Sequence, residues 1–481
     1  MKSTVQRLFS AQWAVSLFLV AFACTPSWLL AAEKSDRPNI VFMLADDQGW
    51  NGLSVAMHPD VPGSKGDYFH TPNLEKLAAQ GMRFSAAYAP ASVCSPTRAS
   101  LLTGKSPAKL HWTKAAPPEE GHKLSEPRLI KSISASETTF AELLQKAGYA
   151  TAHYGKWHIS GGGPGQHGYD EHDGDTGNEN AFKFKDPNPV DIFGMAERAA
   201  SFMERNSRAK KPFFIQLSWN ALHASENANN ATLAKYEKLL SGENTKRITT
   251  AAITEDLDTG VGKVLEAIER LGLTGNTYVI YMSDNGAGGG KKVLNGGKGG
   301  VWEGGIRVPF IVRGPGVKPN SWCHTRVVGY DLYPTFCEWA GIRADALPKG
   351  IEGGSIVSLM TGDDRSDVKR PRDELVFHFP HYQGDAPHSA ILLGDLKLIH
   401  FYEDNRDVLF NLSKDLGERN DLAERMPAEA KKLRNRLDKY LAEVDAQFPT
   451  PNPNYDPSQP AAPDKKQGGG KGKNAGKKPK N

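Results

Sequence analysis

Three short apolar runs constrain the fold of this chain more than any other feature of its sequence. The run at 39–44 is continuous, as expected of a strand buried on both faces of a parallel sheet, and comparable runs follow at 213–218 and 277–282. Segments with helical patterns lie between successive runs, at 191–205 and at 249–271. Because strands that alternate with helices form mostly parallel sheets, we expect an α/β fold with helices on both faces of the sheet.

Further predicted elements extend this alternation. Helices are expected at 71–80 and 136–146, the second followed by a strand at 149–154, and a Gly-rich segment at 295–305 leads into a strand at 310–312. In open α/β sheets, ligands bind beyond the carboxyl ends of the strands. Polar residues recur at these strand ends, so we expect them to share one active site: Asp46, Asp47, His158, His223, Asp284 and Asn285.

Asp46 and Asp47 are adjacent carboxylates directly after a predicted buried strand. They repel each other unless positive charge lies beside them, and a divalent cation with oxygen ligands is the usual solution. A helix cap or a turn is the alternative interpretation. Asp284 and Asn285 add a carboxylate and an amide oxygen, and no cluster of Cys and His lies nearby in the sequence. This donor set suits Ca²⁺, or Mg²⁺, better than zinc.

Cys94 lies at a predicted helix start. Pro96 suits the first helical position because it lacks the amide hydrogen that a first turn leaves unpaired, and Gly104 is a suitable stop. Free amides and the positive end of the helix dipole favour an anion at this place, and Arg98 falls on the same helix face as Cys94. A buried cysteine in a Pro-initiated helix with a surface arginine explains this segment equally well.

Three cations and two histidines complete the predicted site. Arg98, Lys156 and Lys298 would neutralise a tetrahedral oxyanion. Strand alternation places Lys156 and His158 on one side, and His158 and His223 can exchange protons near neutral pH. A metal, an oxyanion clamp and a nucleophile together indicate transfer of a sulfuryl or phosphoryl group. A free cysteine is an unusual nucleophile for such a transfer beside a hard cation.

The first 32 residues have the pattern of a signal peptide. Lys2 and Arg7 precede an apolar run at 13–24, and small residues precede Glu33. The alternative is an uncleaved membrane anchor, but the run is shorter than the ~20 residues that a span needs. We therefore expect export to a periplasm or the medium, without stable membrane insertion. Removal of the signal leaves an odd number of cysteines: Cys94, and Cys323 and Cys337, which either pair or remain separate buried thiols.

The C-terminal part of the chain has a different pattern. After 363–365 the predicted strands are shorter, and a helix is predicted near the end of the fold. We predict a catalytic domain at 33–365, an antiparallel C-terminal subdomain at 366–447 and a disordered tail at 448–481, rich in Lys, Gly and Pro. Aromatic and imidazole side chains in this subdomain either line the substrate entrance or serve strand packing: His378, His381, Tyr382 and His388.

The formal net charge of +4 overstates the basic character of the folded part. Seven lysines and no acidic residues occur in 465–481, so the body of the chain is mildly acidic. An anionic ligand must then be held by local cations rather than by a basic surface, and we expect no nucleic-acid partner.

The segment Cys94-Ser95-Pro96-Thr97-Arg98 resembles the CxPxR signature of type I sulfatases, whose cysteine is oxidised after translation to formylglycine (3-oxoalanine). Other motifs of that family follow in order, over about residues 37 to 447. They are similar to Asp46-Asp47, Gly155-Lys156-Trp157-His158, His223, Asp284-Asn285-Gly286 and Gly297-Lys298 followed by Trp302-Glu303-Gly304-Gly305. Ser225 and Leu416 stand where the family more often has proline.

The resemblance implies an alkaline-phosphatase-like fold and a bound Ca²⁺ held by the carboxylates, Asn285 and the modified residue 94, whose hydrated aldehyde attacks sulfur. Arg98, Lys156 and Lys298 would contact the sulfate or aldehyde oxygens. His223 would protonate the leaving alcohol and His158 would help to regenerate the aldehyde. Asp284 would both bind the metal and help to activate the attacking hydroxyl.

The expected function is that of an exported sulfatase acting on sulfated carbohydrates or polysaccharides, with aryl sulfates as assay substrates. Its implied partners are the carbohydrate and a formylglycine-generating maturation enzyme. Two alternatives stay open: a phosphomonoesterase or phosphonate ester hydrolase of the same superfamily, and an inactive protein that binds anionic glycans.

Overall fold

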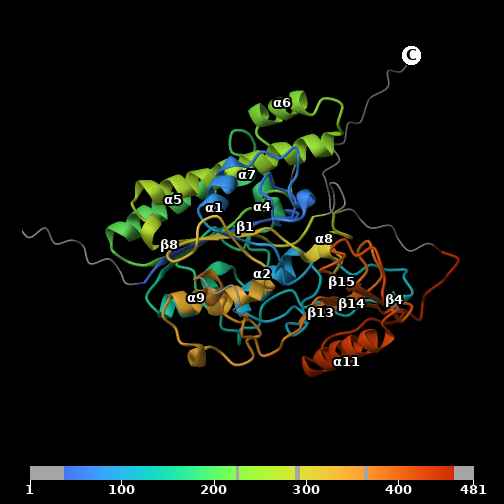
Figure 1. Ribbon diagram of the computed structural model, residues 1–481. Helices are drawn as coiled ribbons and strands as arrows, with labels where there is room; N and C mark the ends of the chain where they lie inside the picture. The colour runs from blue at the N-terminus through green and yellow to red at the C-terminus, as the bar shows by residue number, and fades with distance from the viewer. Residues whose placement is uncertain (1–36, 224–226, 288–292, 362–366, 460–481) are drawn as a thin grey trace, which may run out of the picture. The chain divides into compact units, whose positions relative to one another are not determined.

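The computed structural model describes residues 37–223, 227–287, 293–361 and 367–459 (Figure 1). The predicted signal peptide, Ser225, the domain boundary near 363–365 and the lysines of the tail lie outside the described residues. Contacts divide the chain into two compact units, residues 1–34 and 35–481, and everything below concerns the second. Within the described ranges, no helix has both the length and the apolar character needed to cross a bilayer.

A mixed, mostly parallel sheet carries the predicted site. Five of its seven strand pairings are parallel, and only those that β9 makes with β2 and β8 are antiparallel. The eight strands lie in the order β10 (Ser321–Cys323), β2 (Met82–Phe84), β9 (Phe310–Arg313), β8 (Thr277–Ser283), β1 (Asn39–Ala45), β7 (Phe213–Ser218), β5 (Ala150–Gly155) and β6 (Glu171–His172).

Helices cover both faces of this sheet (Figure 1). Alternate residues of β1 enter two separate cores, Val41 and Met43 in one and Ile40 and Phe42 in the other, which explains the continuous apolar run. The first core takes residues from α1 (Pro72–Ala79), α4 (Asn178–Phe182), α5 (Ile192–Arg208), α6 (Asn230–Leu239) and α7 (Thr245–Arg270). The second takes residues from α2 (Cys94–Thr103), α3 (Phe140–Lys146), α9 (Leu332–Trp339) and α10 (Val357–Met360).

The strand register brings four strand ends to one place. Ala45 of β1 pairs with Ser283 of β8, Leu44 with Ser218 of β7, and Ser218 also with Gly155 of β5. Because these strands are parallel, the residues that follow them emerge at the same edge of the sheet. The predicted α/β fold with a mostly parallel sheet is confirmed.

Helix α2 begins two residues earlier than the sequence predicts. Its first residue is Cys94 and not Pro96, since the amide of Thr97 already donates to the carbonyl of Val93 at 3.4 Å. A proline fits anywhere in a first turn because those amides have no partner inside the helix. Gly104 ends the helix in a left-handed conformation with φ 68°, as predicted.

Helix α3, in contrast, starts later than predicted, at Phe140, because Thr139 forms a capping box. The Thr139 hydroxyl accepts from the amide of Glu142 at 3.1 Å, and the Glu142 carboxylate accepts from the amide of Thr139 at 2.9 Å. The same hydroxyl donates to the carbonyl of His167 at 2.8 Å.

We expect Thr139→Ala to lower the free energy of unfolding by about 1–2 kcal/mol, because the helix loses its cap and a buried carbonyl loses its donor. Urea unfolding followed by circular dichroism measures this. Glu142→Gln keeps an acceptor for the Thr139 amide and should cost clearly less. A loss in Thr139→Ala no larger than that of Glu142→Gln would contradict the capping role.

A smaller antiparallel sheet follows, as predicted, with strands β12 (Leu375–Phe379), β13 (His388–Leu393), β14 (Leu396–Phe401) and β15 (Arg406–Asn411). One face packs on α11 (Pro427–Glu443). The other packs on residues near the predicted site, including Val93, Val301 and Ile306, the last in α8 (Glu303–Ile306). The side chain next to Cys94 and the loop after Lys298 are thus in contact with this second sheet.

Two two-stranded sheets complete the set, β3 (Ala87–Tyr88) with β11 (Val327–Val328) and β4 (Leu124–Ser125) with β16 (Thr450–Pro451). The pairing of β16 means that the first part of the predicted tail makes a regular strand contact. Short 3-10 turns are η1 (Pro62–Ser64), η2 (Pro164–His167), η3 (Pro189–Asp191), η5 (Thr274–Asn276), η6 (Gly329–Asp331) and η7 (Ala344–Ala346). Cys323 and Cys337 are both buried, and they do not form a disulfide with each other.

Candidate active site

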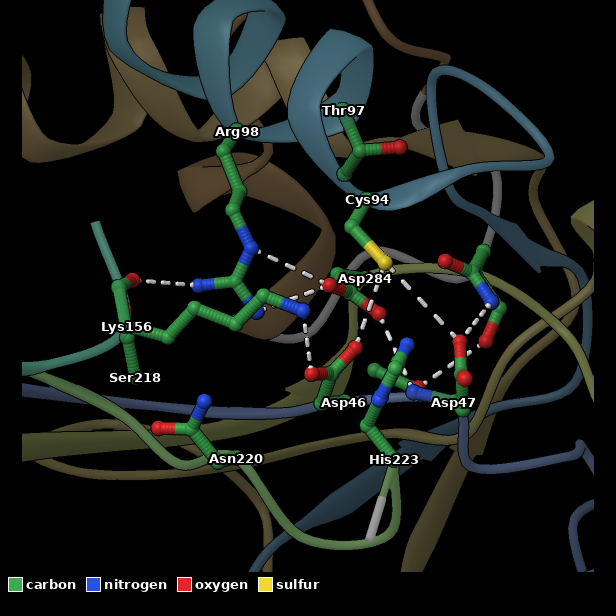
Figure 2. A network of polar contacts seen from close by, with 12 residues as sticks. Asp46, Asp47, Cys94, Thr97, Arg98, Lys156, Ser218, Asn220, His223 and Asp284 are labelled. Carbon is green, nitrogen blue, oxygen red and sulfur yellow. Dashed lines mark hydrogen bonds and ion pairs between the residues drawn. The ribbon is translucent and has the colours of Figure 1, made fainter. Parts of the chain in front are cut away.

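Three carboxylates and Cys94 converge at the carboxyl edge of the large sheet (Figure 2). The amide of Asp284 donates to the carbonyl of Ala45 at 3.0 Å, and the Asp284 carboxylate accepts from the amide of Asp47 at 3.2 Å. One potential ligand atom from each of Asp46, Asp47, Cys94 and Asp284 lies within 4.8 Å of the others. The structure therefore brings together residues that are up to 238 positions apart in the chain.

Asn285 completes an oxygen-rich donor set. Its amide nitrogen donates to Asp47 Oδ1 at 2.8 Å, whereas its buried Oδ1 has no hydrogen-bond partner among the described residues. Buried polar atoms normally have partners, so this unpaired oxygen next to three carboxylates is suited to coordinate a positive ion. Carboxylate and amide oxygens are the donors that Ca²⁺ and Mg²⁺ prefer, and the residues present therefore fit such an ion.

Each carboxylate has a cation beside it. Arg98 donates from Nε and Nη2 to Asp284 Oδ2 at 3.1 and 2.7 Å, and from Nη1 to the carbonyl of Lys156 at 2.6 Å. Lys156 Nζ donates to Asp46 Oδ2 at 2.5 Å. Lys298 Nζ lies 2.7 Å from Asp47 Oδ1 and also donates to Cys94 Sγ at 3.3 Å. Figure 2 shows the contacts of Arg98 with Asp284 and of Lys156 with Asp46, between α2 and the strand ends.

Burial and the close packing of charges shift the pKa values of the carboxylates in opposite directions. Burial alone would raise the pKa of Asp46, but Lys156 and the other cations outweigh it and hold that pKa well below its usual range. Burial and the repulsion from Asp46 raise the pKa of Asp284 to about 6, despite the contact with Arg98. A further positive charge beside Asp284 would therefore favour its ionised form.

Cys94 is a protonated thiol here. Burial, followed by the charges of Asp284 and Asp46, raises its pKa far above the usual range of cysteine. The thiol donates to Asp46 Oδ1 at 3.3 Å. The expected preference of the helix start for an anion is overcome by these carboxylates, so the unmodified side chain is a poor nucleophile.

The two predicted histidines flank the cluster. His158 follows β5 with φ 59°, and its amide donates to the carbonyl of Thr176 at 2.7 Å. Strand β5 ends at Gly155, so Lys156 and His158 lie in the irregular segment after it and not in the strand itself. His223 Nε2 lies 3.4 Å from Asn178 Nδ2. Burial, with the charge of Lys156, lowers the pKa of His158 to about 3, and burial lowers that of His223.

A cavity of about 1500 Å³ opens beside the cluster, larger than a typical small-molecule site. Asp47, His223 and Lys298 form part of its wall. Trp302, from the motif after Lys298, also lines it, and residues without a sequence motif form much of the rest: Lys65, Tyr68, Phe69, Lys246, Arg247, Gln383 and Asp385. No periodic pattern or spacing in the sequence identifies these residues, because they come from separate connecting segments.

The four residues that the sequence suggested for the substrate entrance, His378, His381, Tyr382 and His388, lie away from the cavity. All four are buried, and none is among the residues that line the cavity. His378 contacts Ser389 and the carbonyl of Gln447, His381 contacts Glu126, and Tyr382 stacks on His122. In this geometry they pack the C-terminal sheet, and the neighbours Gln383 and Asp385 reach the cavity in their place.

Comparisons with known proteins all lead to sulfatases. The family model "Sulfatase" matches residues 38–342, and "N-sulphoglucosamine sulphohydrolase, C-terminal" matches residues 297–447. A "Sulfatase" of Formosa agariphila is 30% identical, with 89% of this chain and 94% of that protein covered. The "N-acetylgalactosamine-6-sulfatase" of Canis lupus familiaris is 30% identical over 81% of this chain and 76% of that protein.

Solved structures give the same result for the fold. "Crystal structure of Ps i-CgsB in complex with k-i-k-neocarrahexaose" superposes with a TM-score of 0.69 at 24% identity, over 85% of this chain and 94% of that one. "Structure of BT4656 in complex with its substrate D-Glucosamine-2-N, 6-O-disulfate" superposes with a TM-score of 0.66 at 21% identity, over 85% and 98%.

Proposed function

This chain belongs to the sulfatase family, with its alkaline-phosphatase-like fold, and we propose that it removes sulfate from sulfated carbohydrates. As a sulfatase it is a sulfuric ester hydrolase. The observation that carries the finer proposal is the position of Cys94, whose thiol contacts both a carboxylate of the cluster and Lys298. A thiol held in its neutral form is a poor nucleophile, so we infer that residue 94 acts only after chemical modification.

We propose that Cys94 is converted to formylglycine by a maturation enzyme. The hydrated aldehyde supplies a hydroxyl for attack on the sulfur of the ester. Position 94 is the first residue of α2, so its new oxygens would meet the unpaired amides of the first helical turn. The Lys298 ammonium, 3.3 Å from the present sulfur atom, would donate to one of them.

A divalent cation, Ca²⁺ in preference to Mg²⁺, is the second proposed component. Asp46, Asp47, Asp284 and Asn285 would hold it together with residue 94, and it would supply positive charge at the sulfate oxygens. Three carboxylates face three cations in the protein alone. One bound divalent ion therefore gives the site a net charge of about +2, which favours an anionic ester over a neutral ligand.

Arg98, Lys156 and Lys298 act in this proposal as donors to oxygen atoms. The ionic contacts of Lys156 and Arg98 with carboxylates fix their positions before substrate arrives, so little reorganisation is needed when charge develops on the sulfate. Lys298 is the cation of the three that lines the cavity, and it is therefore assigned to the incoming sulfate group.

His223 is assigned to the leaving alcohol and His158 to the step that regenerates the aldehyde. His223 lines the cavity, where the bridging oxygen of the ester would lie. Its lowered pKa makes it a strong acid once protonated, and the negative charge of a bound sulfate raises that pKa toward neutrality. His158 does not line the cavity, and burial with the charge of Lys156 keeps it neutral, the form in which its ring can accept a proton.

The carbohydrate assignment rests on the relatives and on the cavity. Similar proteins include an N-acetylgalactosamine-6-sulfatase and a protein whose structure contains its substrate D-glucosamine-2-N,6-O-disulfate. The cavity combines aromatic rings with several cations, as expected for sugars that carry anionic groups. We propose that the enzyme is exported by its N-terminal signal sequence and meets its substrate outside the cytoplasm.

The proposal predicts that matured protein prefers sulfate. We expect kcat/KM for an aryl sulfate to exceed that for the matched aryl phosphate by at least about 100-fold, about 2.7 kcal/mol. A preference for phosphate would assign the chain to the phosphatase alternative. The mass of the tryptic peptide that contains Cys94 provides an independent test. Unmodified cysteine, in protein from a host that matures other sulfatases, would favour the non-enzymatic glycan binder.

A further inference from the structure

The Gly-rich loop that carries Lys298 is fixed on two sides. On the side of the catalytic cluster, the amide of Gly299 donates to the carbonyl of Ser92 at 3.0 Å, two residues before Cys94. The amide of Gly286 donates to the carbonyl of Gly305 at 2.9 Å, next to Asn285. The loop is therefore joined by its backbone to both the helix of Cys94 and the segment of Asn285.

The other side of the loop is held by the C-terminal sheet, first through His388. The amide of Val301 donates to His388 Nε2 at 2.9 Å, and His388 Nδ1 lies 2.5 Å from the carbonyl of Ala386. A backbone amide can only donate and a carbonyl can only accept, so His388 is the neutral tautomer with its proton on Nδ1. Burial, which lowers the pKa of His388, is consistent with this state.

A buried ionic cluster makes the second connection. Lys397 Nζ, on β14, lies 2.9 Å from Glu303 Oε1 and 2.7 Å from Glu418 Oε1. Glu418 also accepts from the amide of Glu303 at 2.8 Å, and Arg307 pairs with the other oxygen of Glu303 at 2.7 Å. Glu303 and Lys397 are completely buried. In Figure 1, α8, which begins at Glu303, lies next to β14 and β15.

We propose that the C-terminal sheet positions the ammonium of Lys298, and that His388, Lys397 and Glu418 are positioning residues for the reaction. None of the three lines the cavity, so they act through the loop. Lys298 and Val301 are separated by two glycines, which have few restraints of their own. Without the anchor at Val301, the loop has more freedom and the ammonium leaves its place between Asp47 and residue 94. This inference rests on the proposed role of Lys298.

His388→Leu tests the first anchor, because leucine fills much of the space but accepts no hydrogen bond. We expect kcat for an aryl sulfate to fall about 10- to 100-fold with a small change in KM, since a misplacement of about 1 Å has this effect on a reacting group. His388→Gln can place an oxygen near the former Nε2 and should restore most of the activity. His400→Leu is the matched control, since His400 is buried on the neighbouring strand and contacts Asp407 instead of the loop.

A double-mutant cycle separates positioning from general damage. If His388 acts through Lys298, His388→Leu should cause no further loss of kcat in protein that already carries Lys298→Ala. Additive losses, or equal losses in His388→Leu and His400→Leu, would overturn the proposal. Full activity of Lys298→Ala would instead overturn the assigned role of Lys298, so the two failures are distinguishable.

Hydrogen exchange gives a readout besides activity. The amide of Val301 should exchange faster in His388→Leu, while the peptides of β1 and β8 keep their protection. If His388→Leu does not fold, the charge-balanced double variant Lys397→Met, Glu418→Gln replaces it, because it removes one buried charge of each sign and leaves the Arg307–Glu303 pair. The same loss of kcat and the same faster exchange are expected, and unchanged values of both would refute the positioning role.

Discussion

Cys94→Ala should abolish hydrolysis of sulfate esters, lowering kcat by about 10⁴-fold or more, while the protein stays folded. Loss of a nucleophile has effects of this size because the other groups of a site cannot substitute for the missing bond-forming atom. The measurement is kcat with an aryl sulfate, together with a thermal unfolding curve. Alanine leaves the backbone of α2 unchanged and fits the space of the thiol, so the unfolding temperature should change little.

Cys337→Ala is the matched control for this substitution. Cys337 is a free thiol that is as deeply buried as Cys94, but it packs in the core below the sheet, away from the carboxylate cluster. Its replacement should leave kcat unchanged. Activity of Cys94→Ala above about 1% of the parent protein would show that residue 94 is not the nucleophile, and the proposed mechanism would be wrong.

Removal of divalent cations should have the second largest effect. Dialysis against a chelator is expected to abolish activity, and added Ca²⁺ should restore it. Because the ion binds only the folded cluster, Ca²⁺ at 100 times its dissociation constant should stabilise the protein by about 2.7 kcal/mol, which differential scanning calorimetry detects as a rise in unfolding temperature. This readout is independent of catalysis.

The rise in unfolding temperature that Ca²⁺ causes should depend on pH in a definite direction. The pKa of Asp284 is raised to about 6 in the ion-free cluster, so a proton competes with the metal for this carboxylate below that pH. The rise with Ca²⁺ should therefore be larger at pH 7 than at pH 5. Asp284→Asn should remove most of it. Asp258→Asn is the control, because burial also raises the pKa of Asp258 to about 6. The Asp258 carboxylate accepts from backbone amides of α1 and is not part of the cluster, so this variant should keep the stabilisation by Ca²⁺. Equal loss in both variants would contradict a metal site at Asp284.

The strand ends were predictable because two simple regularities apply there. A strand buried on both faces needs a continuous apolar run, and parallel strands end at the same edge, so Asp46 and Asp284 could be placed together without a structure. The helix start was less certain. Proline is tolerated throughout the first turn, so Pro96 could not distinguish a start at Cys94 from one two residues later.

The surroundings of the C-terminal sheet could not be predicted in the same way. Alternation along β12 separates His378 from Phe377, but it does not say what covers each face. Both faces are covered, one by α11 and the other by the segments around Val93 and Val301. The cavity wall could not be predicted either, since Arg247 lies 4.2 Å from the ring centre of Tyr68 although the two are 179 positions apart and neither belongs to a motif.

The depth of α2 has a consequence for when the proposed maturation can take place. All ten of its residues are buried, and Cys94 is only 2% exposed. An enzyme that modifies the thiol must bind the residues around it, and in the folded chain these residues are buried. The proposed maturation therefore has to take place on the newly made chain, before α2 docks against the sheet. A molecule that folds before modification would stay inactive, so the yield of active enzyme would depend on the relative rates of modification and folding.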